Sequence, residues 1–212
     1  MPLDLSAWTP PERGALFVIT GASGTGKTTL VHEALKVLPD LDWSVSATTR
    51  RPRRGEVDGK DYQFVSTEQF KSMVDAGEML EWAEVYGNSY GTPRAPVVAA
   101  MDEGRSILLE IDLQGARQVR SAMPDAVSVF VLPPDFSVIE ERLRSRATDS
   151  EEVIQRRLAD AWEQLQGVGE FDYLVVNDDL RSAHDRFQAV LVSELQGVSR
   201  HPSLVARFSG HR

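Results

Sequence analysis

One short stretch restricts the possible fold of this chain more than any other. Residues 21–28, GASGTGKT, fit the phosphate-loop pattern G-x-x-x-x-G-K-S/T at all four specified positions. The apolar run at 15–19 directly before them predicts a buried strand over 14–20. Glycines in the loop let backbone N–H groups converge on phosphate oxygens, and a helix beginning near Lys27 directs its positive dipole end to the same place. A glycine-rich turn that binds nothing is the alternative, and the strand and the Lys-Thr pair argue against it.

The motif gives two side chains a chemical role. Lys27 is expected to reach the β- and γ-phosphates of a nucleoside triphosphate, and the Thr28 hydroxyl to coordinate Mg²⁺. The residues predicted to bind the triphosphate are Gly21, Ala22, Ser23, Gly24, Thr25, Gly26, Lys27, Thr28 and Thr29.

Composition narrows the functional class. The 212 residues are 42% hydrophobic and 26% charged, which is typical of a folded protein with one sizeable core. The net charge of −9 argues against a broad nucleic-acid surface, and the lack of cysteine excludes disulfides and thiolate metal sites. Four histidines show no metal-ligand spacing. Neither a membrane span nor a signal segment is evident, so we expect a cytoplasmic protein with no membrane partner.

Apolar patterns predict an α/β fold with a parallel sheet flanked by helices. Strands are expected at about 14–20, 43–47, 62–65, 79–85, 106–111, 127–132 and 173–176. The S-x-x-Q capping box at Ser66 predicts a helix start, and Gly77 a helix end. Residues 86–91 are interpreted as a turn, followed by a helix with Thr92 as its cap and Pro93 at its first position.

Charged residues gather in three places. The loop 48–62 holds four arginines in an otherwise acidic chain, either as solvated charge or for a local purpose. Glu110 and Asp112 follow a predicted buried strand, where open α/β sheets bind ligands. Arginines between 142 and 157 flank a polar connection with helix-start residues Thr148 and Asp149. An exposed helical hairpin is one interpretation, but a phosphate loop in the same chain favours a cationic lid.

Several separate motifs resemble the guanylate kinase family. They are SVSATTRRPR at 44–53, GEV at 55–57, DY at 61–62, Glu81, GNSYG at 87–91, IDLQG at 111–115 and VNDD at 176–179. Their order and spacing cover about 15–195, so the resemblance is far more specific than the phosphate loop alone. It implies a guanylate kinase-like domain over 14–200, with a P-loop NTPase-type core at 14–47, 92–140 and 165–197. A mixed α/β GMP-binding lobe is expected at 48–91 and a helical lid at 141–164, between a leader at 1–13 and a weakly ordered tail at 198–212.

The resemblance also implies roles for single residues. Positions matching Arg50, Arg53, Tyr62 and Tyr90 hold the phosphate of GMP, for which guanidinium forks and phenol hydroxyls are suited. The remaining residues expected at the GMP site are Ser46 and Glu81, which face the base, with Thr92 and Asp112. Glu81 would accept from guanine N1–H and N2–H₂, which AMP cannot offer. Without the resemblance, Glu81 would be interpreted as an exposed strand residue.

The resemblance also implies which residues act on ATP, the phosphoryl donor. Arg142, Arg146 and Arg157 match the cationic lid positions and join Lys27 as expected catalytic residues. Asn177 is expected on the base side of ATP, while Asp112 and Glu110 reach Mg²⁺ through water. The implied reaction transfers the γ-phosphoryl group of ATP to GMP, or to dGMP, and gives ADP and GDP.

Two other readings remain. Scaffold proteins carry inactive guanylate kinase-like modules that bind phosphopeptides, usually with a degraded phosphate loop, and a related kinase could act on another phosphorylated acceptor. Four positions also depart from the family pattern. Ala22 stands where proline is common, Glu110 where aspartate is common, and Ser145 and Ala147 replace two lid glycines, which is expected to alter lid motion.

Overall fold

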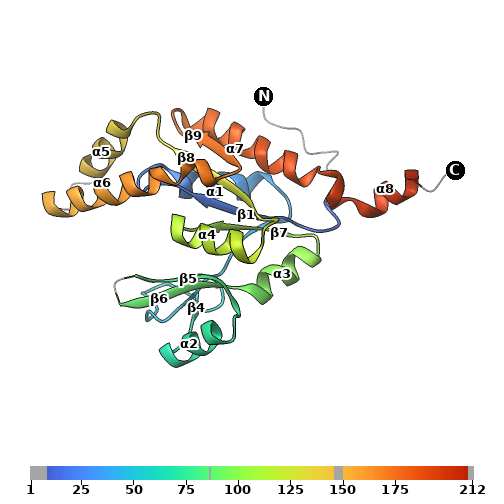
Figure 1. Ribbon diagram of the computed structural model, residues 1–212, viewed down its shortest axis with the longest axis horizontal. Coiled ribbons are helices and arrows are strands. Elements are labelled where there is room, and N and C mark those ends of the chain that lie inside the picture. The colour runs from blue at the N-terminus through green and yellow to red at the C-terminus, as the bar shows by residue number, and fades with distance from the viewer. Residues whose placement is uncertain (1–8, 86, 146–149, 210–212) are drawn as a thin grey trace.

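A five-stranded parallel sheet forms the centre of the molecule (Figure 1). The computed structural model describes residues 9–85, 87–145 and 150–209. Strand order is β2-β7-β1-β8-β9, so the strand that leads into the phosphate loop lies in the middle. The strands are β1 (Leu16–Thr20), β2 (Leu41–Trp43), β7 (Ser106–Glu110), β8 (Val127–Leu132) and β9 (Tyr173–Val176). The expected α/β fold is confirmed.

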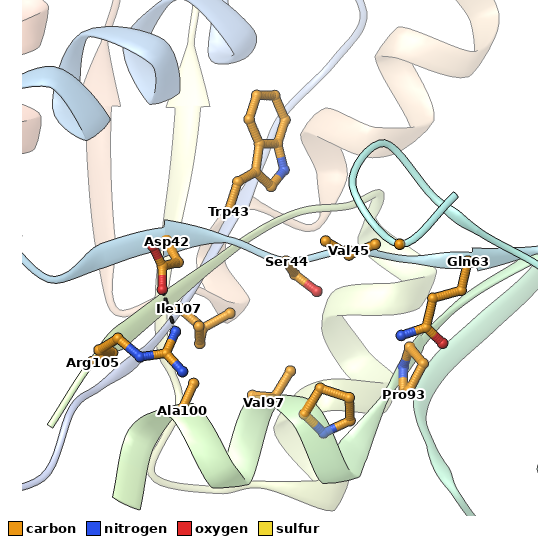
Figure 2. A pocket seen from close by; sticks show the side chains of 12 residues that line it. Asp42, Trp43, Ser44, Val45, Gln63, Pro93, Val97, Ala100, Arg105 and Ile107 are labelled. Carbon is orange, nitrogen blue, oxygen red and sulfur yellow. Dashed lines mark hydrogen bonds and ion pairs between the residues drawn. The ribbon is translucent and has the colours of Figure 1, made fainter. Parts of the chain in front are cut away.

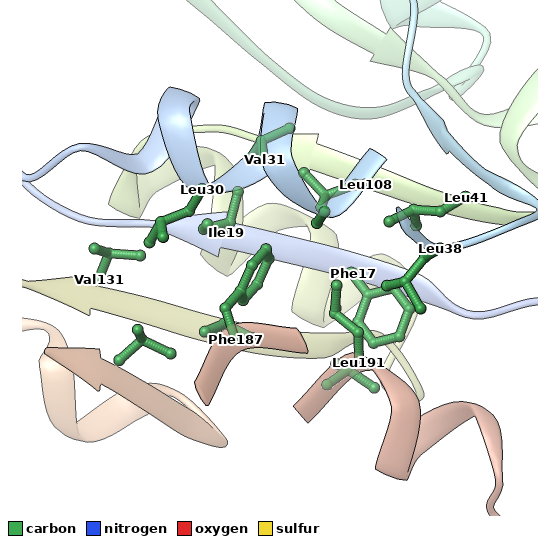
Figure 3. Close-up of a cluster of buried hydrophobic side chains, with 14 of the residues drawn as sticks. Phe17, Ile19, Leu30, Val31, Leu38, Leu41, Leu108, Val131, Phe187 and Leu191 are labelled. Atoms are coloured by element: carbon green, nitrogen blue, oxygen red, sulfur yellow. The ribbon is translucent and has the colours of Figure 1, made fainter. Parts of the chain in front are cut away.

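Helices cover both faces of this sheet. On one face, α1 (Lys27–Val37) and α7 (Leu180–Leu195) pack against β1 through side chains such as Phe17 and Phe187, as Figure 3 shows. On the other, α3 (Arg94–Asp102) and α4 (Leu113–Ala122) bury a second apolar cluster. Each fully buried large apolar side chain contributes about 1.5–3 kcal/mol, so the two clusters fix β1 from both sides. None of the helices in the described ranges is long and apolar enough to cross a bilayer.

A second sheet of four strands lies beyond α4 (Figure 1). Its order is β4-β3-β6-β5, with β3 parallel to β4 and antiparallel to β6. The strands are β3 (Ala47–Thr48), β4 (Gln63–Phe64), β5 (Met79–Val85) and β6 (Asn88–Pro93). Helix α2 (Thr67–Asp75) covers it by burying Phe70 against Ala47 and Met79, and both hydrogen bonds of the predicted capping box at Ser66 are present.

Three sequence-based assignments in this region are wrong. The strand predicted at 43–47 is two strands in different sheets, because the chain leaves the first sheet after Trp43 and enters the second at Ala47. The stretch predicted as a turn becomes strand β6 from Asn88, paired on both sides. Thr92 belongs to that strand, and the N-cap of α3 is Pro93.

Two helices project at one end of the parallel sheet (Figure 1). They are α5 (Phe136–Ser145) and α6 (Glu151–Gln166), which is capped by the Ser150 hydroxyl. The predicted helix-start residues Thr148 and Asp149 lie outside the described residues. Arg144 bridges the two helices through Glu140 and Glu151. A short 3-10 helix, η1 (Val168–Glu170), returns the chain to β9.

The tail is also not as predicted. It forms a 3-10 helix, η2 (Val198–Arg200), and helix α8 (Pro202–Ser209). Glu12 from the leader caps α8 by accepting from the Ser203 N–H at 2.8 Å, and its own N–H donates to the Arg200 carbonyl at 2.9 Å. The described parts of the leader and the tail therefore hold each other.

Candidate active site

The phosphate loop is held in shape by its neighbours. Gly26 is the N-cap of α1 with φ 88°, and a Cβ there would lie 2.3 Å from the Asn177 amide nitrogen. A Cβ on Gly21 would lie 2.4 Å from the Val131 carbonyl. The buried Thr25 hydroxyl donates to the Ala22 carbonyl at 2.9 Å. Glycine is therefore required at 21 and 26 by close packing as well as by backbone conformation.

Lys27 lies over this loop. Its ammonium donates to the carbonyls of Gly21, at 2.5 Å, and Ala22, at 3.0 Å. Burial lowers the pKa of Lys27, and the nearby Glu110 carboxylate opposes this shift. The cation is therefore held at the loop, where a bound phosphate would compensate for its partial desolvation.

Oxygen ligands gather where β1 and β7 end. The Thr28 hydroxyl donates to Glu110 Oε1 at 2.8 Å, and Glu110 pairs in register with Ile19. Mg²⁺ prefers such hard oxygens and is usually held by one or two side chains together with substrate phosphates, so this pair suits it. Within the described ranges, no group of three or more His, Cys, Asp or Glu side chains could hold a metal ion by itself.

Two predicted ATP-site residues from distant segments contact the loop backbone. Asn177, at the end of β9, donates its amide to the Thr25 carbonyl at 2.7 Å and is 5% exposed. It thus supports the loop, and its contact with the ATP base stays a prediction. Arg142, on α5, donates to the Gly24 carbonyl at 3.0 Å. Arg157 is half-buried on α6, and Arg146 lies outside the described residues.

In the second sheet, three of the four residues predicted to hold a phosphate come together. The Arg50 guanidinium lies 5.4 Å from the Tyr62 ring centroid, and Tyr62 packs edge-on against Tyr90 with centroids 6.1 Å apart. Glu56 holds Arg50 through two parallel hydrogen bonds, of 3.0 and 2.8 Å, and its pairing raises the pKa of Arg50. Arg53 is exposed and donates its backbone N–H to Glu56 at 2.7 Å.

Glu56 is the residue that sequence reasoning missed. It stood in the GEV motif, but no role was drawn from it. The signal was weak because Arg50 and Glu56 are six residues apart in a loop, where no regular spacing predicts contact. The structure makes Glu56 the residue that orients Arg50.

Glu81 is buried, which excludes its interpretation as an exposed strand residue. It is 7% exposed, whereas the adjacent Trp82 is 42% exposed. Thr92 donates its hydroxyl to Glu81 Oε1 at 2.7 Å, and a Cβ on Gly115 would lie 3.1 Å from Oε2. Burial raises the pKa of Glu81, and the Asp112 carboxylate adds to the shift. Thr92, Asp112 and Glu81 thus come from three elements to one place.

Asp112 and Ser46 complete the predicted acceptor residues. Asp112 is the N-cap of α4 and accepts from the Gly115 N–H at 2.8 Å. Ser46 is half-buried, and its carbonyl accepts from the Gln63 N–H at 2.9 Å. The predicted acceptor residues therefore form two groups: the buried Glu81 carboxylate with Thr92 and Asp112, and an arginine–tyrosine cluster of Arg50, Tyr62 and Tyr90.

The packing of the loop gives a prediction for Gly26→Ala. The substitution should lower the free energy of unfolding by about 1–3 kcal/mol, because alanine at positive φ is strained and its Cβ displaces Asn177. Urea unfolding measures the change. Gly169→Ala is the matched control, since Gly169 is exposed and its Cβ would meet nothing within 4 Å; a change within about 0.5 kcal/mol is expected. Equal stability of Gly26→Ala and the control would contradict this account.

Fold and loop together define a P-loop α/β protein, and comparison with known proteins identifies its family. The guanylate kinase family model matches residues 13–194. A guanylate kinase of Carboxydothermus hydrogenoformans is 50% identical over 183 residues, covering 86% of this chain and 90% of the relative. One from Thermosynechococcus vestitus is 54% identical over 173 residues, covering 82% and 91%.

A solved structure agrees with these sequence matches. The crystal structure of guanylate kinase from Anaplasma phagocytophilum matches with a TM-score of 0.69 and 35% identity, covering 90% of this chain and 91% of that one. The chain belongs to the guanylate kinase family, as the motifs predicted.

Proposed function

We propose that this protein transfers the γ-phosphoryl group of ATP to GMP, giving ADP and GDP. The observation that carries the proposal is the buried Glu81 carboxylate in a chain with an intact phosphate loop. The loop accounts for the donor, and a carboxylate with one oxygen held by Thr92 accounts for recognition of guanine. Membership of the guanylate kinase family supports both.

On the donor side, the loop amides and the first turn of α1 bind the phosphates of ATP. Lys27 moves its hydrogen bonds from the Gly21 and Ala22 carbonyls to the β- and γ-phosphates. Thr28 and Glu110 would hold Mg²⁺, which would supply positive charge to neutralise the phosphates of ATP. Arg142 and Arg157 on the lid helices add positive charge around the transferring group, and Arg146 is proposed to join them.

On the acceptor side, Arg50 with Tyr62 and Tyr90 grips the phosphate of GMP, and Arg53 joins from the same loop. Glu81 accepts from guanine N1–H and N2–H₂, while the Ser46 hydroxyl donates to O6. AMP would place a lone pair against Glu81 and leave buried polar groups unpaired. Sites of this kind reject the wrong analogue by about 10⁴-fold or more.

Alignment and charge neutralisation are sufficient for the chemical step. A phosphate oxygen of GMP forms a bond to the γ-phosphorus of ATP, the bond from that phosphorus to the bridging oxygen breaks, and ADP leaves. The acceptor phosphate is already ionised near neutral pH, so no general base is required. Closure of the lid excludes water and prevents wasteful hydrolysis of ATP.

The proposal is tested by measuring ADP release from ATP and Mg²⁺ with a panel of acceptors: GMP, dGMP, AMP, CMP, UMP and TMP. GMP is expected to be turned over fastest, with dGMP second. No ADP release with GMP would contradict the proposal. Faster release with another monophosphate would favour a related kinase with a different acceptor.

The raised pKa of Glu81 predicts a pH dependence of GMP binding. Ionised Glu81 is the form that accepts from guanine, and burial raises its pKa above the ordinary 4.5. The KM for GMP should therefore rise on acidification at a higher pH than an exposed glutamate would give. The folded chain also binds this proton more tightly than the unfolded chain, so the contribution of Glu81 to stability declines as pH rises through the same range.

The measurement is the KM for GMP as a function of pH in the wild type and in Glu81→Gln. Protonation of the GMP phosphate, with a second pKa of about 6, affects both proteins equally. The difference between the two profiles isolates the carboxylate. Parallel profiles at every pH would contradict the role of Glu81 in binding the base.

A further inference from the structure

The side-chain amide of Gln118 forms hydrogen bonds with both backbone polar groups of Trp82. Its Oε1 accepts from the Trp82 N–H at 3.1 Å, and its Nε2 donates to the Trp82 carbonyl at 3.0 Å. Gln118 belongs to α4, which packs on the parallel sheet, and Trp82 belongs to β5 of the second sheet. One side chain therefore joins the two halves of the molecule by a pair of hydrogen bonds.

The position of β5 explains why this contact is available. β5 is an edge strand, paired only with β6 in the sheet order β4-β3-β6-β5. In an antiparallel edge strand, alternate residues direct both backbone groups away from the neighbouring strand. Trp82 is such a residue, and Gln118 takes the place of the missing strand. Two parallel hydrogen bonds restrict both the position of β5 along α4 and the angle between the two elements, whereas a single bond would still allow rotation.

Residue Glu81 lies immediately before this anchor. Its carboxylate lies on the other side of the strand backbone from the Trp82 ring and reaches Gly115, one helical turn before Gln118 on the same face of α4. The N-cap of the same helix is Asp112, whose charge acts on Glu81. A shift of β5 along α4 would therefore move Glu81 relative to Gly115 and Asp112 directly.

The junction between the two sheets is less closely packed where the chain itself crosses it. The chain crosses from one sheet to the other at Ser44–Ser46 and returns at Pro93. A cavity of about 400 Å³ lies here, with Ser44 and Val45 on one side and Val97 of α3 on the other (Figure 2). This side of the junction leaves room for movement. On the other side, β5 meets α4 through the buried Leu80, which packs in one cluster with Ala116 and Val119, and through the Gln118 pair, which adds the directional bonds that apolar packing lacks.

We propose that Gln118 is a positioning residue for guanine recognition: its amide acts as a surrogate strand that fixes β5 on α4 and so holds Glu81 at the base. This inference rests on the proposed function, because it concerns how the same site reads its acceptor. Gln118 itself touches neither nucleotide. Its effect is transmitted through the Trp82 backbone.

The test is Gln118→Met, which has a similar length but neither donor nor acceptor. Loss of two neutral hydrogen bonds should raise the KM for GMP about tenfold, with kcat changed less than about threefold and the KM for ATP unchanged. The ratio of GMP to AMP turnover should fall. Hydrogen exchange of the Trp82 amide, followed by NMR, should become about tenfold faster. Ser121→Met, at an exposed site on the same helix, is the control and should change none of these values.

Each outcome decides one point. Unchanged Trp82 exchange and unchanged KM for GMP would overturn the proposal. Faster exchange with an unchanged KM for GMP would make the contact structural only, which also contradicts a positioning role. Absence of GMP turnover in the wild type would refute the proposed function instead, and with it the positioning role, while the exchange rate would still report whether the anchor exists.

Discussion

Replacement of Lys27 by alanine is expected to lower kcat by about 10³-fold while leaving the dissociation constant of GMP nearly unchanged. Lys27 is proposed to act on the phosphates of ATP, and the charge it neutralises is greatest in the transition state. The arginine–tyrosine cluster that would hold GMP lies in the second sheet and does not include Lys27. Steady-state ADP release gives kcat, and calorimetric titration with GMP alone gives the dissociation constant.

Lys36→Ala is the matched control for this experiment. Lys36 is on the same helix, and its side chain is 65% exposed and paired with Glu33. Its removal should leave kcat within a factor of about two, since a surface ion pair contributes little. Turnover of Lys27→Ala equal to that of the control would refute the role of Lys27.

Glu81→Gln should lower kcat/KM for GMP by about 10³-fold without lowering the residual turnover of AMP, whose ring lone pair can accept from an amide N–H. The substitution removes two charge-assisted hydrogen bonds to guanine, each worth about 1.5–3 kcal/mol. It also places an amide N–H opposite the guanine N–H groups, where neither can accept a hydrogen bond. Thr92 keeps an acceptor oxygen in the glutamine variant, so the second sheet should remain folded. The measurement is kcat/KM for both acceptors.

Glu84→Gln is the control for Glu81, because Glu84 is exposed on the same strand. It makes the same chemical change three residues away, and both kcat/KM values should match the wild type. An equal loss for GMP and AMP in Glu81→Gln would show that Glu81 supports the structure and does not select the base.

The elements that sequence reasoning predicted well are those with purely local causes. β8 and β9 have the expected bounds, because a short, mainly apolar run with β-branched residues between turn residues suits a strand. The capping box at Ser66 involves residues only three apart, so its hydrogen bonds could be predicted from the letters. The phosphate loop is likewise contiguous, and its motif predicted the strand before it and the helix after it.

β6 was missed because its structure depends on partners far away in the sequence. Residues 88–91 are polar and contain a glycine, which locally favours a turn. Pairing with β3, about forty residues earlier, and with β5 makes them a central strand. A Cβ on Gly91 would lie 2.7 Å from the Glu81 carbonyl, so this glycine serves close packing, not a turn. Helix α8 was missed for a similar reason, since its capping residue is Glu12.

In the candidate active site, too, features with local causes were predicted and those with long-range causes were not. Motifs and the family resemblance led to Lys27, Arg50 and Glu81, and also to Thr92 and Asn177, but not to the contacts by which these two support the site. Asn177 reaches the loop from 152 residues away, and this contact exists only once β9 joins the sheet. The orientation of Arg50 by Glu56 and the Gln118 anchor also required coordinates, since neither follows a helical or strand period.

The strand order has a consequence for how the protein is made. β1 leaves the ribosome first among the strands, but its two neighbours in the sheet are β7 and β8. The Ala15 N–H must wait for the Ser106 hydroxyl, 91 residues further along, which takes about 5–18 s at translation rates of about 5–20 residues per second. During that interval an apolar strand has no partner. The phosphate loop is thus synthesised early, but the sheet that supports it is completed only after β7 and β8 have been translated.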